Sequence, residues 1–266
     1  MAGDYFENKS SIIIYTLFRD TGGFYRNSGP FWEPGAFGGY LMLGLIFNFI
    51  KTNSFFNKKT VIILIALVST TSTTAYIALF FFLFFIAYRT KLKLIYKFLL
   101  LIIVVSASGY LYLNVDFLSQ KVQSQLQSAE ASSISSNTNS QRFLSTLRDI
   151  QDIRNHFFWG RGPNPKTRYN VSNSSDIRTN GFSDYWVRYG SVFFVLSLFY
   201  LYQSFKGICC YFDSKFAIFS LIIILIILQS ETYFNYPLFW GLFFLNNVYS
   251  CQKKYDAKHI KPIVSF

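Results

Sequence analysis

The sequence predicts an all-α protein: a polytopic bundle of transmembrane helices with about seven crossings, two of them short, and one large external loop that carries an amphipathic helix. Three observations indicate this fold class. Hydrophobic residues make up 52% of the chain and charged residues only 14%, against about 25% charged residues in soluble domains. Long runs carry no charge, and lysine-rich segments separate them. We therefore expect a single integral membrane domain over residues 1–266, with residues 116–185 as the external (periplasmic) loop.

The expected spans follow from the charge-free runs, because a membrane-spanning helix needs about 20 mostly apolar residues. Residues 11–18 are too short to span, so we expect them to lie in the membrane interface or to end a helix. The other expected spans cover residues 36–50, 60–88, 98–113, 186–205, 216–230 and 238–250, of which 186–205 carries one charge, Arg188, near its start. Because basic segments face the cytoplasm, the stretch before residue 36 is expected outside and the C-terminus inside.

Residues 60–88 form a charge-free run of 29 residues between two basic segments, 51–59 and 89–97. Since both segments are expected on the cytoplasmic side, the run must cross outward and return. Its centre, residues 69–74, has the sequence STTSTT. Hydroxyl side chains can satisfy the backbone groups that a helix break exposes. We therefore predict two short helices that break at this cluster. The alternative is one long tilted helix.

The external loop holds one segment with helical periodicity. Residues 141–154 have the sequence QRFLSTLRDIQDIR, in which Phe143, Leu147, Ile150 and Arg154 fall near the spacing of one helix face. We expect an amphipathic helix at the membrane surface. The sequence HFFWGRG at residues 156–162 is expected to end it.

Charge and cysteine content exclude several classes of function. The net charge of +12 is carried largely by short lysine-rich segments between apolar runs, which is typical of membrane topology and not of nucleic-acid binding. The three cysteines form no CxxC spacing and predict no disulfide framework, and the sequence shows no zinc-ligand spacing. The GRG sequence at residues 160–162 lacks the preceding strand of a dinucleotide-binding motif. We expect no cofactor, no metal and no nucleic-acid partner.

In this topology, lysines lie mainly on the expected cytoplasmic side of the membrane and arginines mainly on the external side. The expected cytoplasmic segments carry 12 Lys and one Arg against two acidic residues, and the external segments carry nine Arg and three Lys against eleven acidic residues. A guanidinium matches phosphate oxygens two at a time, so external arginines suit a phosphate-bearing ligand anchored in lipid. The alternative is ion pairing, and Arg148 and Asp152 stand four residues apart on the expected helix. The other acidic candidates for such pairs are Asp149, Asp176 and Asp184.

Residues 26–39, with the sequence RNSGPFWEPGAFGG, lie at the start of the first expected span. They combine Arg26, Glu33, two prolines and four glycines. Proline and glycine break a helix here, and non-helical backbone at membrane depth occurs only where protein or a water-filled cavity covers it. We therefore expect this stretch to line a site. The alternative is a loop that caps a helix.

Several sequences make the chain recognisable by their order. RNSGPFWEPGAFGGYL resembles the Arg-x-x-Gly-x-Phe-x-Glu-Pro-x-x-Phe-Gly element of bacterial O-antigen polymerases of the Wzy type, within the O-antigen ligase and polymerase superfamily. STTSTTAYIAL is similar to the next element, and QRFLSTLRDIQDIRNHFFWGRGP to the loop where an arginine opens a helix that ends at Gly-x-Gly. TNGFSDYWVRYGSVFF is similar to the Asn-Gly return into the membrane, and SETYFNYPLFWGLFF to the last hairpin.

The resemblance implies a metal-independent glycosyltransferase on the external face of the bacterial inner membrane. It would join repeat units carried on undecaprenyl pyrophosphate into O-antigen or capsule. Arg26 and Arg142 would bind the pyrophosphate, and Arg148 or Arg161 would assist them. Glu33 would orient Arg26 or act as the base, and we favour the first role because a carboxylate at membrane depth is costly unless it is paired. The remaining substrate-binding candidates are Gly160, Gly162 and Asn180.

Several alternatives stay open. Ligases of the superfamily tend to have a histidine before the Asn-Gly element, where this chain has Thr179, and this favours a polymerase over a ligase. A transporter of lipid-linked sugar would also use broken helices, although the sequence shows no internal repeat. His156 and Glu231 are weaker candidates for a catalytic base, because the first suits a membrane interface and the second a helix cap or an ion pair.

Family members usually carry several helices before the Arg26 element. We therefore expect this chain to be part of a split or truncated gene, to need a partner, or to be an inactive remnant. The expected partners are the lipid-linked glycan, the bilayer and a chain-length regulator protein.

Overall fold

The computed structural model of the chain describes residues 8–12, 15–19, 25–55, 57–89, 149–164 and 180–248. Several expectations lie outside these residues. They are the span at 98–113, the start of the loop helix with Arg142 and Arg148, and the lysine-rich segments after residues 89 and 248.

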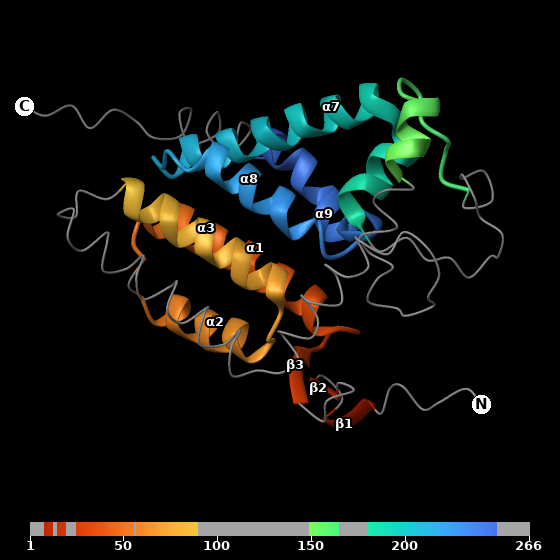
Figure 1. Ribbon diagram of the computed structural model, residues 1–266. Helices are drawn as coiled ribbons and strands as arrows, with labels where there is room; N and C mark the ends of the chain where they lie inside the picture. The colour runs from red at the N-terminus through yellow and green to blue at the C-terminus, as the bar shows by residue number, and fades with distance from the viewer. Residues whose placement is uncertain are drawn as a thin grey trace, which may run out of the picture.

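Helices run side by side through most of the described chain (Figure 1). They are α1 (Pro34–Thr52), α2 (Lys58–Ser69), α3 (Thr73–Arg89), α7 (Gly181–Tyr211), α8 (Ala217–Ile227) and α9 (Pro237–Gly241), with the short 3-10 helices η2 (Tyr233–Asn235) and η3 (Leu242–Phe244). Residues 149–155 are also helical. α1 packs against α2 and α3, and α8 packs against α3 and α7. The predicted helical class is confirmed for the described residues, and the seven crossings stay a prediction.

Within the described residues, α7 is the helix that is long and apolar enough to cross a membrane. It contains the predicted span 186–205 and extends beyond it at both ends. Non-helical dihedral angles at Gly190, with φ of 73° and ψ of 173°, divide it into two parts. No pattern in the sequence predicted this kink.

The predicted break in the run 60–88 is confirmed. α2 ends at Ser69 and α3 begins at Thr73. Thr71, between them, has a left-handed φ of 46°. The hydroxyl of Thr70 donates to the carbonyl of Leu67 at 2.7 Å and accepts from the backbone N–H of Ser72 at 3.3 Å. Side-chain hydroxyls therefore satisfy backbone groups at the break, and the alternative of one long helix is wrong.

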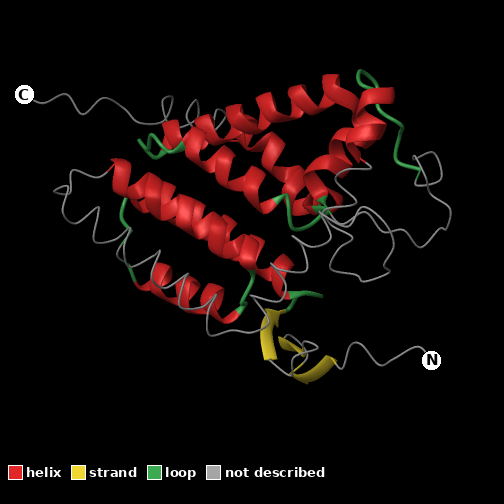
Figure 2. Ribbon diagram, viewed as in Figure 1, coloured by secondary structure: helices red, strands yellow, loops and turns green. Residues whose placement is uncertain are grey.

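The N-terminal region corrects one of the two alternatives given for residues 11–18, because it forms strands and not a helix end. A position in the membrane interface stays a prediction. β1 (Asn8–Ile12), β2 (Tyr15–Arg19) and β3 (Tyr25–Gly29) form an antiparallel sheet in the order β1-β2-β3. The strands lie at one end of the helices (Figure 2). The run SIIIYTLF is rich in β-branched and aromatic residues, which favour strands. The all-α class therefore omitted a small sheet.

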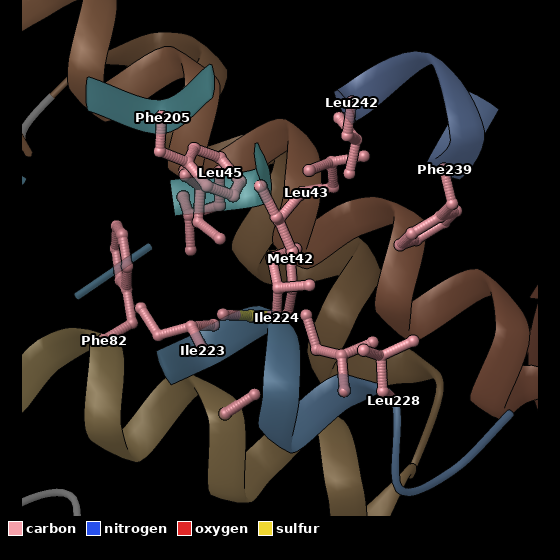
Figure 3. Close-up of a cluster of buried hydrophobic side chains, with 14 of the residues drawn as sticks. Met42, Leu43, Leu45, Phe82, Phe205, Ile223, Ile224, Leu228, Phe239 and Leu242 are labelled. Carbon is pink, nitrogen blue, oxygen red and sulfur yellow. The ribbon is translucent and has the colours of Figure 1, made fainter. Parts of the chain in front are cut away.

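One apolar core joins the helices. Side chains from α1, α3, α7 and the C-terminal helices meet in it (Figure 3). The labelled members are Met42, Leu43, Leu45, Phe82, Phe205, Ile223, Ile224, Leu228, Phe239 and Leu242. Phe216 packs edge-to-face against Phe49 and Phe82 at centroid distances of 4.8 and 5.6 Å. Such aromatic pairs contribute beyond the area they bury, so the core fixes how the helices sit against one another.

The two ends of the helices differ in charge. At one end, Asn53 after α1 donates to the carbonyl of Phe212 after α7 at 3.0 Å. Lysines lie on α1 and α2 near this end and in the α7–α8 connection: Lys51, Lys58, Lys59 and Lys215. The opposite end holds the sheet and the start of α1 (Figure 1). The side of the membrane on which each end lies stays a prediction.

Candidate functional site

Arg26 lies on β3 and reaches the break between α2 and α3. Its Nε donates to Thr71 Oγ1 at 2.8 Å and to Thr70 O at 3.3 Å, and its NH2 donates to Thr71 O at 3.0 Å. The residue is buried, with 8% relative exposure. The last carbonyls of a helix have no partner within that helix, so the break supplies acceptors that hold the guanidinium in one orientation.

The backbone after Arg26 is fixed by local contacts. Asn27 donates through its side-chain amide to Ser69 Oγ at 2.8 Å and accepts from the N–H of Gly29 at 2.9 Å. Gly29 has a φ of 54°, and a Cβ there would lie 2.9 Å from the ring of Phe37. The ring of Phe31 stacks on that of Phe37 at 5.6 Å. These contacts tie the glycine-rich turn to both α2 and α1.

Glu33 stands immediately before the first turn of α1, which begins at Pro34. The residue is partly buried. Its Oε1 lies 2.8 Å from the point where a Cβ on Gly35 would stand, so the carboxylate folds back over the start of the helix. A helix N-terminus stabilises negative charge. The start of α1 is thus a second environment, besides pairing with Arg26, that would stabilise the Glu33 carboxylate. The roles of Glu33 as a base or in orienting Arg26 stay predictions.

Tyr233 joins the C-terminal segment to the start of α1. Its side chain is fully buried, and its hydroxyl donates to the carbonyls of Gly35 and Ala36 at 2.8 and 3.3 Å. Burial raises the pKa of the Tyr233 hydroxyl well above its usual range, so the group stays protonated and remains a donor. Beside it, the rings of Trp32 and Tyr236 stack at 4.6 Å.

A second polar cluster lies where residues 149–164 meet α7. Ser183 Oγ donates to Asp149 Oδ2 at 2.6 Å. Arg161 Nε lies 2.9 Å from Asp152 Oδ1. Asp149 and Asp152 are fully buried, and a buried carboxylate is costly unless it is paired or hydrogen-bonded. The ion-pair alternative is therefore confirmed for Arg161. The pair of Arg148 with Asp152 considered from the sequence stays a prediction, because Arg148 lies outside the described residues.

Arg188 extends this cluster toward η2. It pairs with Asp184 one helical turn earlier at 2.6 Å. It also donates through NH1 to Asn235 Oδ1 at 3.0 Å. Because η2 carries both Asn235 and Tyr233, this short element links the Arg161 cluster to the start of α1. The two polar regions therefore belong to one end of the molecule.

The glycines and the asparagine of the predicted binding set make intramolecular contacts. Gly160 has a φ of 70°, and a Cβ there would lie 2.5 Å from the backbone nitrogen of Gly190. Gly162 has a φ of 82° and donates its N–H to the carbonyl of Arg188 at 3.0 Å. Asn180 caps α7 by accepting from two backbone N–H groups, and it donates to Gln229 Oε1 at 2.9 Å. Their binding of substrate stays a prediction.

The structure brings Arg26, Glu33 and the Ser/Thr break together with the segment around Tyr233. Arg142 and Arg148 lie outside the described residues. Sequence reasoning identified the hydroxyl cluster but not Thr71 as the partner of Arg26. It also missed Tyr233, whose contacts join positions nearly 200 residues apart. No local signal identifies either contact, because both depend on how the helices pack.

Comparison with protein-family models, curated proteins and solved structures finds no match. Among the residues that the structure describes, no group of three or more histidine, cysteine or acidic side chains could hold a metal ion. Cys209, which is buried, and Cys210, which is exposed, both lie in α7.

Proposed function

We propose that this chain is a membrane glycosyltransferase that joins lipid-linked oligosaccharide repeat units on the external face of a bacterial inner membrane. The observation that carries the proposal is the buried guanidinium of Arg26, held at a helix break at one end of an apolar helical core. A cation fixed in this way suits a lipid-anchored pyrophosphate, because the ligand's tail lies in the bilayer and its charged group at the membrane surface.

The outward surface of the helices supports a membrane location. Large apolar side chains are exposed along α2 and α7: Val61, Ile62, Ile65, Phe193, Val195 and Phe199. In the most apolar stretch of 18 residues in α7, only 33% is buried within the molecule. Exposed apolar surface on this scale marks an interface with a membrane or a partner. The lysines at the opposite end from Arg26 suit the cytoplasmic side.

The hydrogen bonds of Arg26 support a role at a leaving group. Three of its hydrogen bonds go to neutral acceptors, the carbonyls of Thr70 and Thr71 and the Thr71 hydroxyl. Bonds to neutral oxygens orient a guanidinium without themselves cancelling its charge. Cations that are fixed before the reaction stabilise the charge that develops in the transition state.

The proposed reaction transfers a glycan from pyrophosphate to a sugar hydroxyl. The acceptor oxygen forms a glycosidic bond to the anomeric carbon of the donor, and the bond from that carbon to the pyrophosphate oxygen breaks. The hydroxyl proton passes to a base, and the electron pair leaves with the lipid pyrophosphate. Arg26 would stabilise that leaving group. Glu33, for which Arg26 is the nearest arginine in sequence, would orient Arg26 or serve as the base.

Surface glycan from a strain that lacks the gene tests this proposal. We expect long chains to disappear from a gel while single-repeat glycan remains, and the wild-type gene to restore the long chains. A ligase would give a different pattern, in which long glycan accumulates on the lipid carrier and is absent from the final acceptor. Long chains that persist unchanged without the gene would contradict the proposal.

A further inference from the structure

Residues 156–160, with the sequence HFFWG, form an exposed aromatic loop after the helical residues 149–155. The relative exposures are 48% for Phe157, 63% for Phe158 and 73% for Trp159. Exposure of three consecutive large aromatic side chains is unfavourable in water. The exposure of these rings therefore needs an explanation, and the proposed transfer reaction does not supply one.

The backbone of the aromatic loop is held firmly although its rings point outward. The N–H groups of Ser191 and Val192 donate to the carbonyls of Phe157 and Phe158 at 2.8 and 3.4 Å. On the other side of Gly160, the N–H of Arg161 donates to the carbonyl of Val187 at 2.8 Å. These bonds use the backbone groups that the kink at Gly190 frees. The backbone of the loop is thus hydrogen-bonded to α7 at the kink, and its position is fixed relative to α7.

The length of α7 places the loop at a defined depth. After the kink, the helix from Ser191 to Tyr211 is about 30 Å long at 1.5 Å per residue, and this equals the thickness of the bilayer's hydrocarbon core, about 30 Å. If this part of α7 spans the membrane, the kink and the aromatic loop lie at the level of one membrane surface.

The chemistry around the loop matches that surface. On α7, the exposed apolar residues Phe193 and Val195 begin directly after the hydrogen bonds to the loop, so the apolar surface continues from the helix onto the loop. Arg154 and His156, which are also exposed, come directly before the three aromatic residues in the chain. Tryptophan is enriched where the hydrocarbon meets the headgroups, and cationic side chains there can contact lipid phosphates.

We propose that the aromatic loop anchors the external segment in the outer surface of the bilayer. Phe157, Phe158 and Trp159 insert between headgroups and acyl chains, and their attachment at Gly190 sets the depth of the kink. This inference rests on the membrane location in the proposed function and not on the transfer reaction. It therefore stands or falls separately from the polymerase activity.

Tryptophan fluorescence of the full chain in lipid vesicles tests the anchor. The protein is reconstituted with phosphatidylethanolamine and phosphatidylglycerol in which an acyl chain carries a doxyl quencher, either near the headgroup or deep in the chain. The difference in emission between wild type and Trp159→Phe reports Trp159. Because Trp159 is exposed and the replacement is aromatic, we expect the variant to fold. Trp186→Phe is the matched control, since Trp186 lies in α7 near the kink but stacks on Phe194 at 4.7 Å.

We expect the shallow quencher to reduce the Trp159 signal at least about twofold more than the deep quencher does. The Trp186 signal should respond less to the shallow quencher than the Trp159 signal does. A Trp159 signal that neither lipid affects but that aqueous iodide quenches would overturn the proposal, because the loop would then face water and be free to contact glycan or protein. Equal quenching of Trp159 and Trp186 would also overturn it.

Discussion

Two arginines at the same end of the molecule are held in different ways. Arg161 pairs with the buried carboxylate of Asp152. Arg26 donates to the neutral oxygens of Thr70 and Thr71. An ion pair offsets the charge of the guanidinium, whereas bonds to neutral oxygens only orient it. The comparison indicates that Arg161 stabilises the fold where the external segment meets α7, and that Arg26 is held in place by the oxygens of the break between α2 and α3.

Asp152→Ala should have the largest effect on stability. It removes a buried charged partner and leaves the Arg161 guanidinium in a largely buried site, which costs about 3 kcal/mol of unfolding free energy. Thermal unfolding in detergent, followed by circular dichroism, measures this. Arg154→Ala is the control, because Arg154 is an exposed arginine in the same helix and its loss should change stability by less than about 0.5 kcal/mol. Equal unfolding midpoints for both variants would contradict a structural role for the Arg161 pair.

Gly160→Ala should be the next most destabilising change. Its Cβ would stand 2.5 Å from the nitrogen of Gly190, in a left-handed conformation that alanine disfavours. We expect a loss of about 2 kcal/mol. Gly162→Ala is a matched control, because Gly162 is also left-handed but nothing lies within 4 Å of its added Cβ. If both variants lose the same stability, backbone strain alone explains the effect and the close approach to α7 is unimportant.

Tyr233→Phe tests the attachment of η2 to the start of α1. The change keeps the buried ring but removes the hydroxyl that donates to Gly35 and Ala36. We expect a loss of about 1 kcal/mol in unfolding free energy, the usual value for one hydrogen bond. Shortened glycan chains at normal protein level would show that the start of α1 must be held for activity. An unchanged melting curve would mean that the ring alone fixes η2.

Thr71→Ala should have the smallest effect on stability. It tests whether the orientation of Arg26 matters for glycan transfer. It removes the hydroxyl that accepts from Arg26 Nε at 2.8 Å and leaves the backbone acceptors in place. The expected loss of stability is below about 1 kcal/mol, with a visible shift toward shorter glycan. Thr71→Ser retains the hydroxyl and should restore wild-type chain lengths. Wild-type lengths in the alanine variant would mean that this bond does not matter for transfer.

Local signals in the sequence predicted much of the helical fold. The charge-free runs identified the segments that became α1, α7 and α8, and the hydroxyl cluster at residues 69–74 identified the break between α2 and α3. The strands were missed because the run SIIIYTLF at residues 11–18 covers parts of two paired strands, β1 and β2, and its composition does not show where one strand ends and the next begins. The kink at Gly190 was missed for a related reason, since its cause is the backbone near Gly160, far away in the chain.

The candidate site was predictable to a lesser extent. Arg26 and Glu33 were identified from the glycine- and proline-rich stretch at residues 26–39. Arg161 was identified because it is an arginine on the expected external side of the membrane. Residue type alone could not separate Arg26 from Arg161, because their bonding partners differ only after folding. The acceptor Thr71 and the donor Tyr233 are long-range partners, so only packing reveals them.

The chain lengths of surface glycan made with Arg26→Ala test the central claim most directly. The variant replaces the wild-type gene, and its membrane level is measured in parallel by immunoblot. Lys59→Ala is the control, because it removes one positive charge at the opposite end of the helices. We predict that Arg26→Ala is present in the membrane but yields only single-repeat glycan, and that Lys59→Ala yields wild-type chains. Long chains made by Arg26→Ala at a normal protein level would contradict the assignment of Arg26 to the leaving pyrophosphate.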